Sequence, residues 1–262
     1  MQWDIVPEVL STLIVIIMLV NSRSGNAVPS TRDKIFRFSL YYTIFCVALN
    51  ILSTQTVYHA QVIPLWVNMV VNTAYFLLYP PLPLVFIMYL LLYVYDIVPF
   101  EHRQRFRIFT VLLFSSMVLY MVVVLMNITT GWIFSFDEFG TYIRGPLNRL
   151  SLMVASFQIS VTVYAIWIER EHLDKTFFQV ILWLPVLSLG IITLQFMFPD
   201  ILLTGTAMTL AMLSVYLNFQ TRRISIDTLT QYPNRSSFIY TLEQLYRHNR
   251  KALVLVVSLD DF

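Results

Sequence analysis

The chain has 262 residues, of which 58% are apolar and only 12% are charged. Soluble domains usually contain about 45–50% apolar and about 25% charged residues, so this composition excludes an ordinary water-soluble protein. The mean hydropathy of +0.70 also indicates an integral membrane protein. The net charge of +2 says little about partners by itself, and we expect membrane lipid but no nucleic acid among them.

Seven stretches are apolar and long enough for membrane helices of about 20 residues. In chain order they cover residues 5–20, 36–53, 63–95, 106–126, 147–167, 177–196 and 201–217. The third stretch contains Pro80, Pro81 and Pro83, and as one straight helix it would measure about 50 Å against a hydrocarbon core of about 30 Å. Because prolines bend membrane helices without necessarily ending them, this stretch is either one kinked, tilted helix or two short ones.

Few polar residues fall within the apolar stretches. Glu8 is the one ionisable residue embedded in a span, which makes it a candidate for function, although it lies near the predicted interface. Asn68 and Asn72 are four residues apart and share a helix face. They form either interhelical hydrogen bonds or part of a polar pocket for a small ligand. The single cysteine, Cys46, is expected to be a small buried apolar residue.

The loop between the fourth and fifth predicted helices has structure of its own. Residues 132–136 and 141–144 have the composition of strands, and the residues between them suit a turn. We expect a small hairpin that caps the bundle. It either acts as a lid held by interfacial aromatic residues or covers a ligand pocket, with Asp137, Glu138 and Arg144 as polar contacts.

The four histidines fall in loops or at helix ends and show no metal-ligand spacing. They are His59, His102, His172 and His248. No series of acidic residues and histidines crosses the predicted membrane region, so the sequence gives little support to a proton-coupled transporter.

Basic residues are distributed very unequally between alternate loops. If residues 63–95 form one span, the loops on one side contain eleven basic residues, whereas Arg144 is the only one on the other side. The eleven are Arg23, Arg32, Lys34, Arg37, Arg103, Arg105, Arg107, Arg170, Lys175, Arg222 and Arg223. Basic loops stay in the cytoplasm, so this pattern predicts seven spans with the N-terminus outside and the C-terminus inside.

The C-terminal segment has the order of an α/β domain. A short helical pattern after Pro233 and Asn234 leads into an apolar run, residues 252–257, as expected of a strand covered on both faces. The segment resembles the start of a GGDEF domain, the catalytic unit of diguanylate cyclases, which begins D-x-L-T-G-L-x-N-R and continues to a strand ending D-x-D-x-F. The matching residues are Asp227, Leu229, Thr230, Asn234, Arg235, Phe238, Asp260 and Phe262.

The resemblance also predicts a defect. In the family, the first Asp of D-x-D-x-F binds the catalytic divalent metal, and the aligned residue here is Ser258. A neutral hydroxyl is a much poorer Mg²⁺ ligand than a carboxylate. Residues 1–262 also lack the family's Gly-Gly-Asp/Glu-Glu-Phe signature. We therefore expect no catalytic or metal-binding residues and no cofactor in this chain, since Mg²⁺ and GTP are implied only for a complete domain.

Together these features predict an all-α polytopic membrane protein with seven transmembrane helices, followed by an incomplete α/β GGDEF-like segment. The expected parts are a sensor domain (1–218), a linker (219–226) and the truncated domain (227–262). The seven-helix plan is similar to sensor modules found ahead of bacterial histidine kinases and GGDEF proteins. This resemblance implies a sensor of a small-molecule or membrane signal in the bacterial inner membrane, with a homodimer as the expected assembly. The alternative is a stand-alone membrane receptor with a vestigial tail.

The charge distribution gives a direct test of topology. A reporter active only in the cytoplasm should be active when fused after Arg223 and silent when fused within residues 54–62 or 127–146. The opposite result at any of the three sites would contradict the seven-span topology.

Overall fold

The computed structural model describes residues 4–23, 31–137, 140–173, 175–198 and 201–220, together with Phe238, Leu242 and Leu253. The chain divides into two compact units, residues 1–218 and 219–262. Nearly all the described residues belong to the first unit, and apart from turns and one small hairpin these residues are helical.

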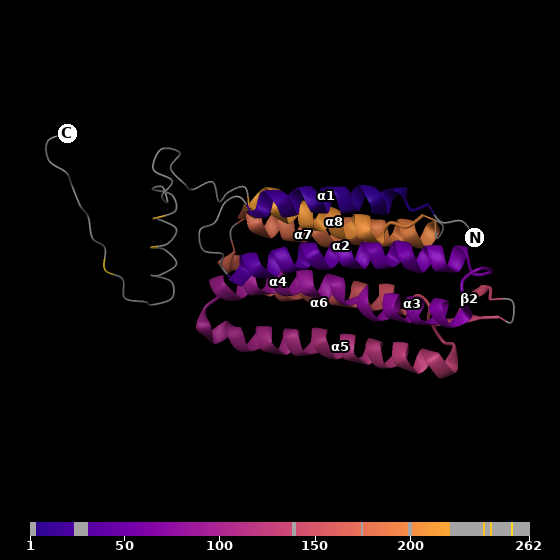
Figure 1. Ribbon diagram of the computed structural model, residues 1–262. Coiled ribbons are helices and arrows are strands. Elements are labelled where there is room, and N and C mark those ends of the chain that lie inside the picture. The colour runs from indigo at the N-terminus through magenta and orange to yellow at the C-terminus, as the bar shows by residue number, and fades with distance from the viewer. Residues whose placement is uncertain are drawn as a thin grey trace, which may run out of the picture. The chain divides into compact units, whose positions relative to one another are not determined.

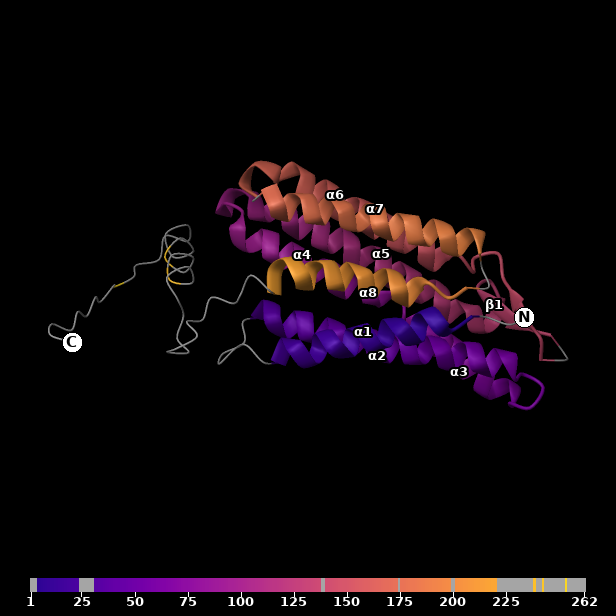
Figure 2. The ribbon, with the colours of Figure 1, turned by 90° about the horizontal axis from the view of Figure 1, so that it is seen from above.

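The first unit is a bundle of helices that run side by side (Figures 1 and 2). The helices are α1 (Val6–Arg23), α2 (Thr31–Tyr58), α3 (Leu65–Leu78), α4 (Pro81–Ile97), α5 (Arg103–Thr130), α6 (Leu150–Ile168), α7 (Lys175–Met197) and α8 (Thr204–Val215). Short turns η1 (Phe100–His102) and η2 (Arg170–His172) precede α5 and α7, and a π-helical turn, η3 (Tyr216–Gln220), follows α8.

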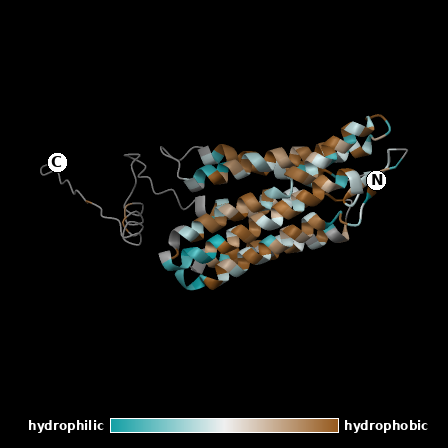
Figure 3. Cartoon of the chain, turned by 90° about the horizontal axis from the view of Figure 1, so that it is seen from below, coloured by the Kyte–Doolittle hydropathy of each residue, from teal (hydrophilic) through white to brown (hydrophobic). Residues whose placement is uncertain are grey.

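The surface of the bundle is that of a membrane-spanning protein. Within the described ranges, five helical segments are long and apolar enough to cross a bilayer, and α3 with α4 counts as one of them. The 28 residues of α5 extend about 42 Å, and its exposed side chains include Val111, Leu119 and Leu125. Figure 3 shows hydrophobic residues along the middle of the bundle and hydrophilic ones gathered at the end away from the N-terminus.

The proline-rich stretch forms two consecutive helices, α3 and α4, that are separated by Tyr79 and Pro80. Proline has no N–H, so Pro80 cannot donate to the carbonyl of Phe76, four residues earlier. The Tyr120 hydroxyl of α5 donates to that carbonyl instead, at 3.1 Å. The Leu78 carbonyl likewise accepts hydrogen bonds from the side chains of Tyr42 and Cys46. Neighbouring helices therefore satisfy the carbonyls of Phe76 and Leu78 at the break in the helix.

The predicted hairpin is confirmed, with β1 (Phe134–Phe136) antiparallel to β2 (Tyr142–Arg144). The Asn127 side chain holds it to the end of α5. Asn127 Oδ1 accepts from the Ile133 and Phe134 N–H groups at 2.6 and 3.2 Å, and its Nδ2 donates to the Phe134 carbonyl at 3.0 Å. The Phe134 ring stacks on Phe76 of α3, with centroids 5.4 Å apart. We call this end of the bundle the hairpin end.

The first predicted stretch, residues 5–20, corresponds to α1, whose apolar part covers Val6–Ser22. The last stretch is shorter as an α-helix than expected, because α8 covers Thr204–Val215 although the stretch was predicted over residues 201–217. Ile201 forms a parallel bridge with Asp4, and the Leu202 N–H donates to the Asp4 carbonyl at 3.2 Å. The backbone before Thr204 is thus used to join the start of α1 to the α7–α8 connection.

Candidate functional site

A cavity of about 290 Å³ lies inside the bundle. Residues of α2, α3, α4, α6, α7, α8 and the hairpin line it, and neither α1 nor α5 contributes a described lining residue. Small-molecule sites commonly form between the helices of bundles, and they combine apolar walls with a few well-placed polar groups.

Polar side chains of α2 and α3 line the cavity toward the hairpin end. Asn50, Ser53 and Thr54 lie on one face of α2, at positions i, i+3 and i+4. The Ser53 hydroxyl donates to Asn72 Oδ1 of α3 at 2.9 Å, and Asn72 Nδ2 donates to the Asn68 carbonyl at 2.9 Å. The side chains of Asn50, Ser53, Thr54 and Asn72 are buried. The two hydrogen bonds of Asn72 fix the orientation of its amide.

The hairpin contributes one cationic and one phenolic group to the wall. Tyr142 and Arg144 of β2 line the cavity beside Asn148 and Arg149, which precede α6. Asn148 Nδ2 donates to the Tyr142 hydroxyl oxygen at 3.0 Å and to the Ile133 carbonyl at 2.9 Å. Burial raises the pKa of Tyr142 to about 12, an effect that its Asn148 hydrogen bond partly offsets. Tyr142 is therefore a neutral phenol at physiological pH.

Most of the remaining lining is apolar, although Thr162 of α6 and Ser188 of α7 also belong to it. Phe86 and Leu90 of α4 face Ile181 and Leu184 of α7 and Ala211 of α8. These positions lie toward the end of the bundle opposite the hairpin, since α4 runs away from the hairpin end and α7 starts at the opposite end (Figure 1). The cavity is thus amphipathic along the bundle axis, with two arginines at one end and a mainly apolar lining at the other.

Glu8 lies outside this lining but supports it. Its carboxylate is fully buried, and Oε1 accepts from Asn50 Nδ2 at 3.1 Å and from the Gly205 N–H at 3.0 Å. Gly205 is in the first turn of α8, where free N–H groups and the helix dipole favour a negative charge. One carboxylate therefore joins α1 to the start of α8 and to Asn50 in the cavity wall.

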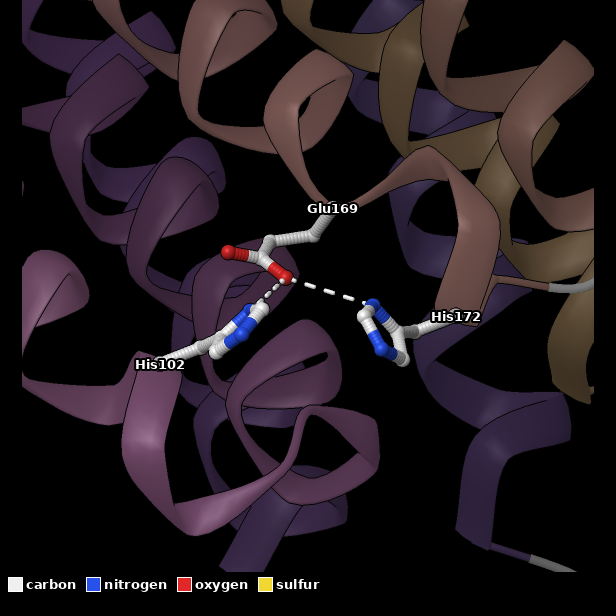
Figure 4. A group of neighbouring side chains, drawn as sticks. All are labelled: His102, Glu169 and His172. Carbon is white, nitrogen blue, oxygen red and sulfur yellow. Dashed lines mark hydrogen bonds and ion pairs between the residues drawn. The ribbon is translucent and has the colours of Figure 1, made fainter.

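A second polar cluster lies at the opposite end of the bundle. His102 at the end of η1 and His172 at the end of η2 both approach Glu169, which follows α6 (Figure 4). Their Nδ1 atoms lie 2.8 and 3.4 Å from Glu169 Oε2. Glu169 is 1% exposed. Its side chain and those of the two histidines place one possible ligand atom each within 4.8 Å of one another.

The cavity brings together two of the five residues predicted to sense a ligand, Asn72 and Arg144. Asn68 does not line it and offers its backbone carbonyl to Asn72. Asp137 does not line it either, because its Oδ1 accepts from the Thr141 N–H at 2.6 Å and closes the hairpin turn. Glu138 lies outside the described residues.

The GGDEF-like positions cannot be placed in the same way. Of the residues that carry the resemblance, only Phe238 is among the described positions. The others, with Ser258, lie outside them, namely Asp227, Leu229, Thr230, Asn234, Arg235, Ser258, Asp260 and Phe262.

Sequence reasoning missed several residues of both clusters. Ser53 and Thr54 carry a signal that could have been found, since they fall on the helix face of Asn50. Tyr142 and Asn148 carry no such signal, because they approach the cavity only through the position of the hairpin and of the start of α6 in the folded chain. His102 and Glu169 are 67 residues apart, so no local spacing rule connects them.

Comparison with protein-family models, with curated proteins and with solved structures gives no match to this chain. The coarse class therefore follows from the chain itself, which is a helical membrane-type protein with an amphipathic internal cavity.

The Glu8 contact makes a prediction about Gly205. A Cβ atom added at this position would lie 1.8 Å from Glu8 Oε2 and 2.9 Å from Val47 Cγ2. We expect Gly205→Ala to lower the free energy of unfolding by about 3 kcal/mol, at the upper end of the range for overpacking. Urea unfolding in detergent micelles, followed by helical circular dichroism, measures the change.

Gly190 of α7 is the matched control, because a Cβ added there meets no atom within 4 Å. Gly190→Ala should be neutral or stabilise by up to about 1 kcal/mol, as expected for alanine in place of glycine within a helix. Equal stability of the two variants would show that Glu8 does not pack against Gly205 as described.

Proposed function

We propose that this chain is a membrane sensor in which a small amphipathic molecule binds in the bundle cavity. The observation that carries the proposal is the cavity's division into a polar end, with Arg144 and Arg149, and an apolar end. A chain with only a structural role would gain nothing from burying so many polar side chains around a space, because each one costs desolvation.

The chemistry of the lining favours a ligand with an anionic head and an apolar body. Arg144 and Arg149 would attract a carboxylate or a similar anion, and arginine can bind such a group in a bidentate manner. The Tyr142 phenol and the Asn72 amide offer further polar contacts. The walls formed by Phe86, Leu90 and Ile181 suit an alkyl chain or a ring.

We further propose seven membrane spans, with the hairpin end outside the cell and the opposite end in the cytoplasm. This topology counts α3 and α4 as one span, as their continuous apolar segment favours, and adds α1 and α8. The eleven-to-one distribution of basic residues supports the orientation. In this arrangement α8, which contributes Thr204, Met208 and Ala211 to the cavity, leads directly in sequence to the residues after Gln220.

The output that we propose is cyclic di-GMP signalling. Its support is the GGDEF-like pattern of residues 227–262, which follows α8 after a short junction. A ligand that moves α8 would act on the start of that domain through the chain connection alone. A stand-alone membrane receptor is the second candidate, and the cavity supports it equally, since the cavity lies wholly within the bundle.

The proposed ligand class can be tested with a fluorescent fatty acid and its alcohol analogue, using the full chain in lipid nanodiscs. We expect saturable binding of the acid, weakened about tenfold or more by Arg144→Gln through loss of a charge-assisted hydrogen bond. The alcohol should bind equally to both proteins.

Arg170→Gln is the matched control for charge, because Arg170 lies over the Trp167 ring at 5.0 Å and does not line the cavity. Binding of the acid that responds equally to both arginine variants would mean attraction to the protein surface rather than to the cavity. A further variant, Ala155→Trp, fills the cavity from α6 and should abolish binding of both probes.

The output proposal predicts an absence of catalysis that can be traced to Ser258. Purified residues 1–262 should not convert GTP to cyclic di-GMP. To isolate the cause, residues 227–262 are replaced by the complete domain of an active cyclase, with either Asp or Ser at the aligned position. The Ser form should lose about 10²–10³-fold in rate, as is typical when one catalytic charge interaction is removed. Equal rates would contradict the alignment of Ser258 with the metal ligand.

A further inference from the structure

We infer that His102, Glu169 and His172 form a binding site for a divalent transition metal, with Zn²⁺ as the preferred ion. The site joins the connection between α4 and α5 to the connection between α6 and α7, and it is independent of the cavity and of the proposed function. The inference rests on the types of ligand, on the distances between them, and on the burial and hydrogen bonding of the Glu169 carboxylate.

The ligand set suits zinc rather than a hard cation. Two imidazole nitrogens and one carboxylate are a recurrent protein ligand set for Zn²⁺, whereas Mg²⁺ and Ca²⁺ prefer oxygen alone. Three protein ligands leave a fourth position for water. His102 and His172 are 32% and 37% exposed at their side chains, so an ion can reach the site from solvent.

The two histidine-to-glutamate distances are close to those of a tetrahedral site, and all three ligand atoms lie within 4.8 Å of one another. Zn–N and Zn–O bonds of about 2.0–2.1 Å place two tetrahedral ligand atoms about 3.3 Å apart. Nδ1 of His172 is already 3.4 Å from Glu169 Oε2. Nδ1 of His102, at 2.8 Å, has to move away by about half an ångström, a change within reach of a half-exposed ring.

Glu169 supplies the second, independent observation. It is almost fully buried, and among the described residues its Oε1 has no hydrogen-bond partner. Burying a carboxylate is costly unless charge and hydrogen bonds compensate. A bound cation would provide that compensation, in either a monodentate or a bidentate arrangement.

The backbone also preorganises the site. The His172 N–H donates to the Glu169 carbonyl at 3.0 Å, which fixes the two residues in one turn. Val98 and Leu173, beside η1 and η2 in the chain, are buried. Both histidines therefore emerge from turns that are anchored to the bundle.

The test uses the full chain in detergent micelles, stripped with a chelator and titrated with Zn²⁺ against a chromophoric competitor. We expect one zinc ion per chain. Variants His102→Gln, His172→Gln and Glu169→Gln should each weaken binding by more than about tenfold, since loss of even an outer-shell partner costs about 10–100-fold. His59→Gln is the matched control, because His59 is exposed in the turn after α2 and far from the cluster in sequence, and this variant should bind zinc as the unmodified chain does.

Two further measurements keep the result independent of how well the variants fold. Zinc should raise the thermal midpoint of the unmodified chain and of His59→Gln but not of His172→Gln. Cobalt bound to the unmodified chain should give the strong visible absorption of a four- or five-coordinate site. Absence of stoichiometric binding, equal affinity in all variants, or an octahedral cobalt spectrum would overturn the inference and leave a hydrogen-bonded His–Glu–His cluster only.

Discussion

Every backbone group freed inside an apolar bundle has to find a partner within the protein, because neither lipid nor hydrocarbon side chains can supply one. The break between α3 and α4 shows how this requirement shapes the molecule. Pro80 removes the donor for the Phe76 carbonyl, and Tyr120 of α5 replaces it. The Leu78 carbonyl engages α2 through Tyr42 and Cys46. The break thus binds α3 to two other helices, and Cys46 contributes a hydrogen bond besides the apolar packing expected of it.

The same requirement positions the ends of the helices that surround the cavity. At the start of α8, Glu8 accepts from the Gly205 N–H, and Gln195 accepts from the Leu203 N–H at 2.7 Å while it donates to the Ile201 carbonyl at 2.7 Å. At the end of α5, the Asn127 side chain accepts a hydrogen bond from the Ile133 N–H, next to the hairpin. These polar side chains hold in place the segments that carry Thr204 and Arg144. The cavity wall therefore depends on all three of them, although only Gln195 among the three is part of the lining.

The sequence was informative where a physical signal is local. Composition and apolar length predict a helical membrane protein, and strand-forming residues on both sides of a turn predict the hairpin. The sequence was less informative where long-range contacts decide. The α8 start at Thr204 depends on Asp4 pairing with Ile201, and no rule of helix propensity includes that bridge. The sequence places the charged residue Asp137 near the expected ligand pocket. In the structure, however, its carboxylate accepts a hydrogen bond from the Thr141 N–H and so belongs to the hairpin turn.

The histidine cluster illustrates the limit most clearly. Local metal-binding motifs are recognised by two ligands within about five residues, and Glu169 with His172 alone is too common a pair to indicate a site. Only the meeting of η1 with η2 adds His102, and that meeting follows from α4 and α6 packing side by side in the bundle.

The two ends of the bundle differ in chemistry. The hairpin end carries arginines and neutral amides around the polar part of the cavity, whereas the opposite end holds a buried carboxylate between two imidazoles. α6 extends from one to the other, with Ser151 and Leu152 in the cavity wall near its start and Glu169 directly after its last residue. A change in the packing of α6 would therefore alter both the cavity wall and the histidine cluster.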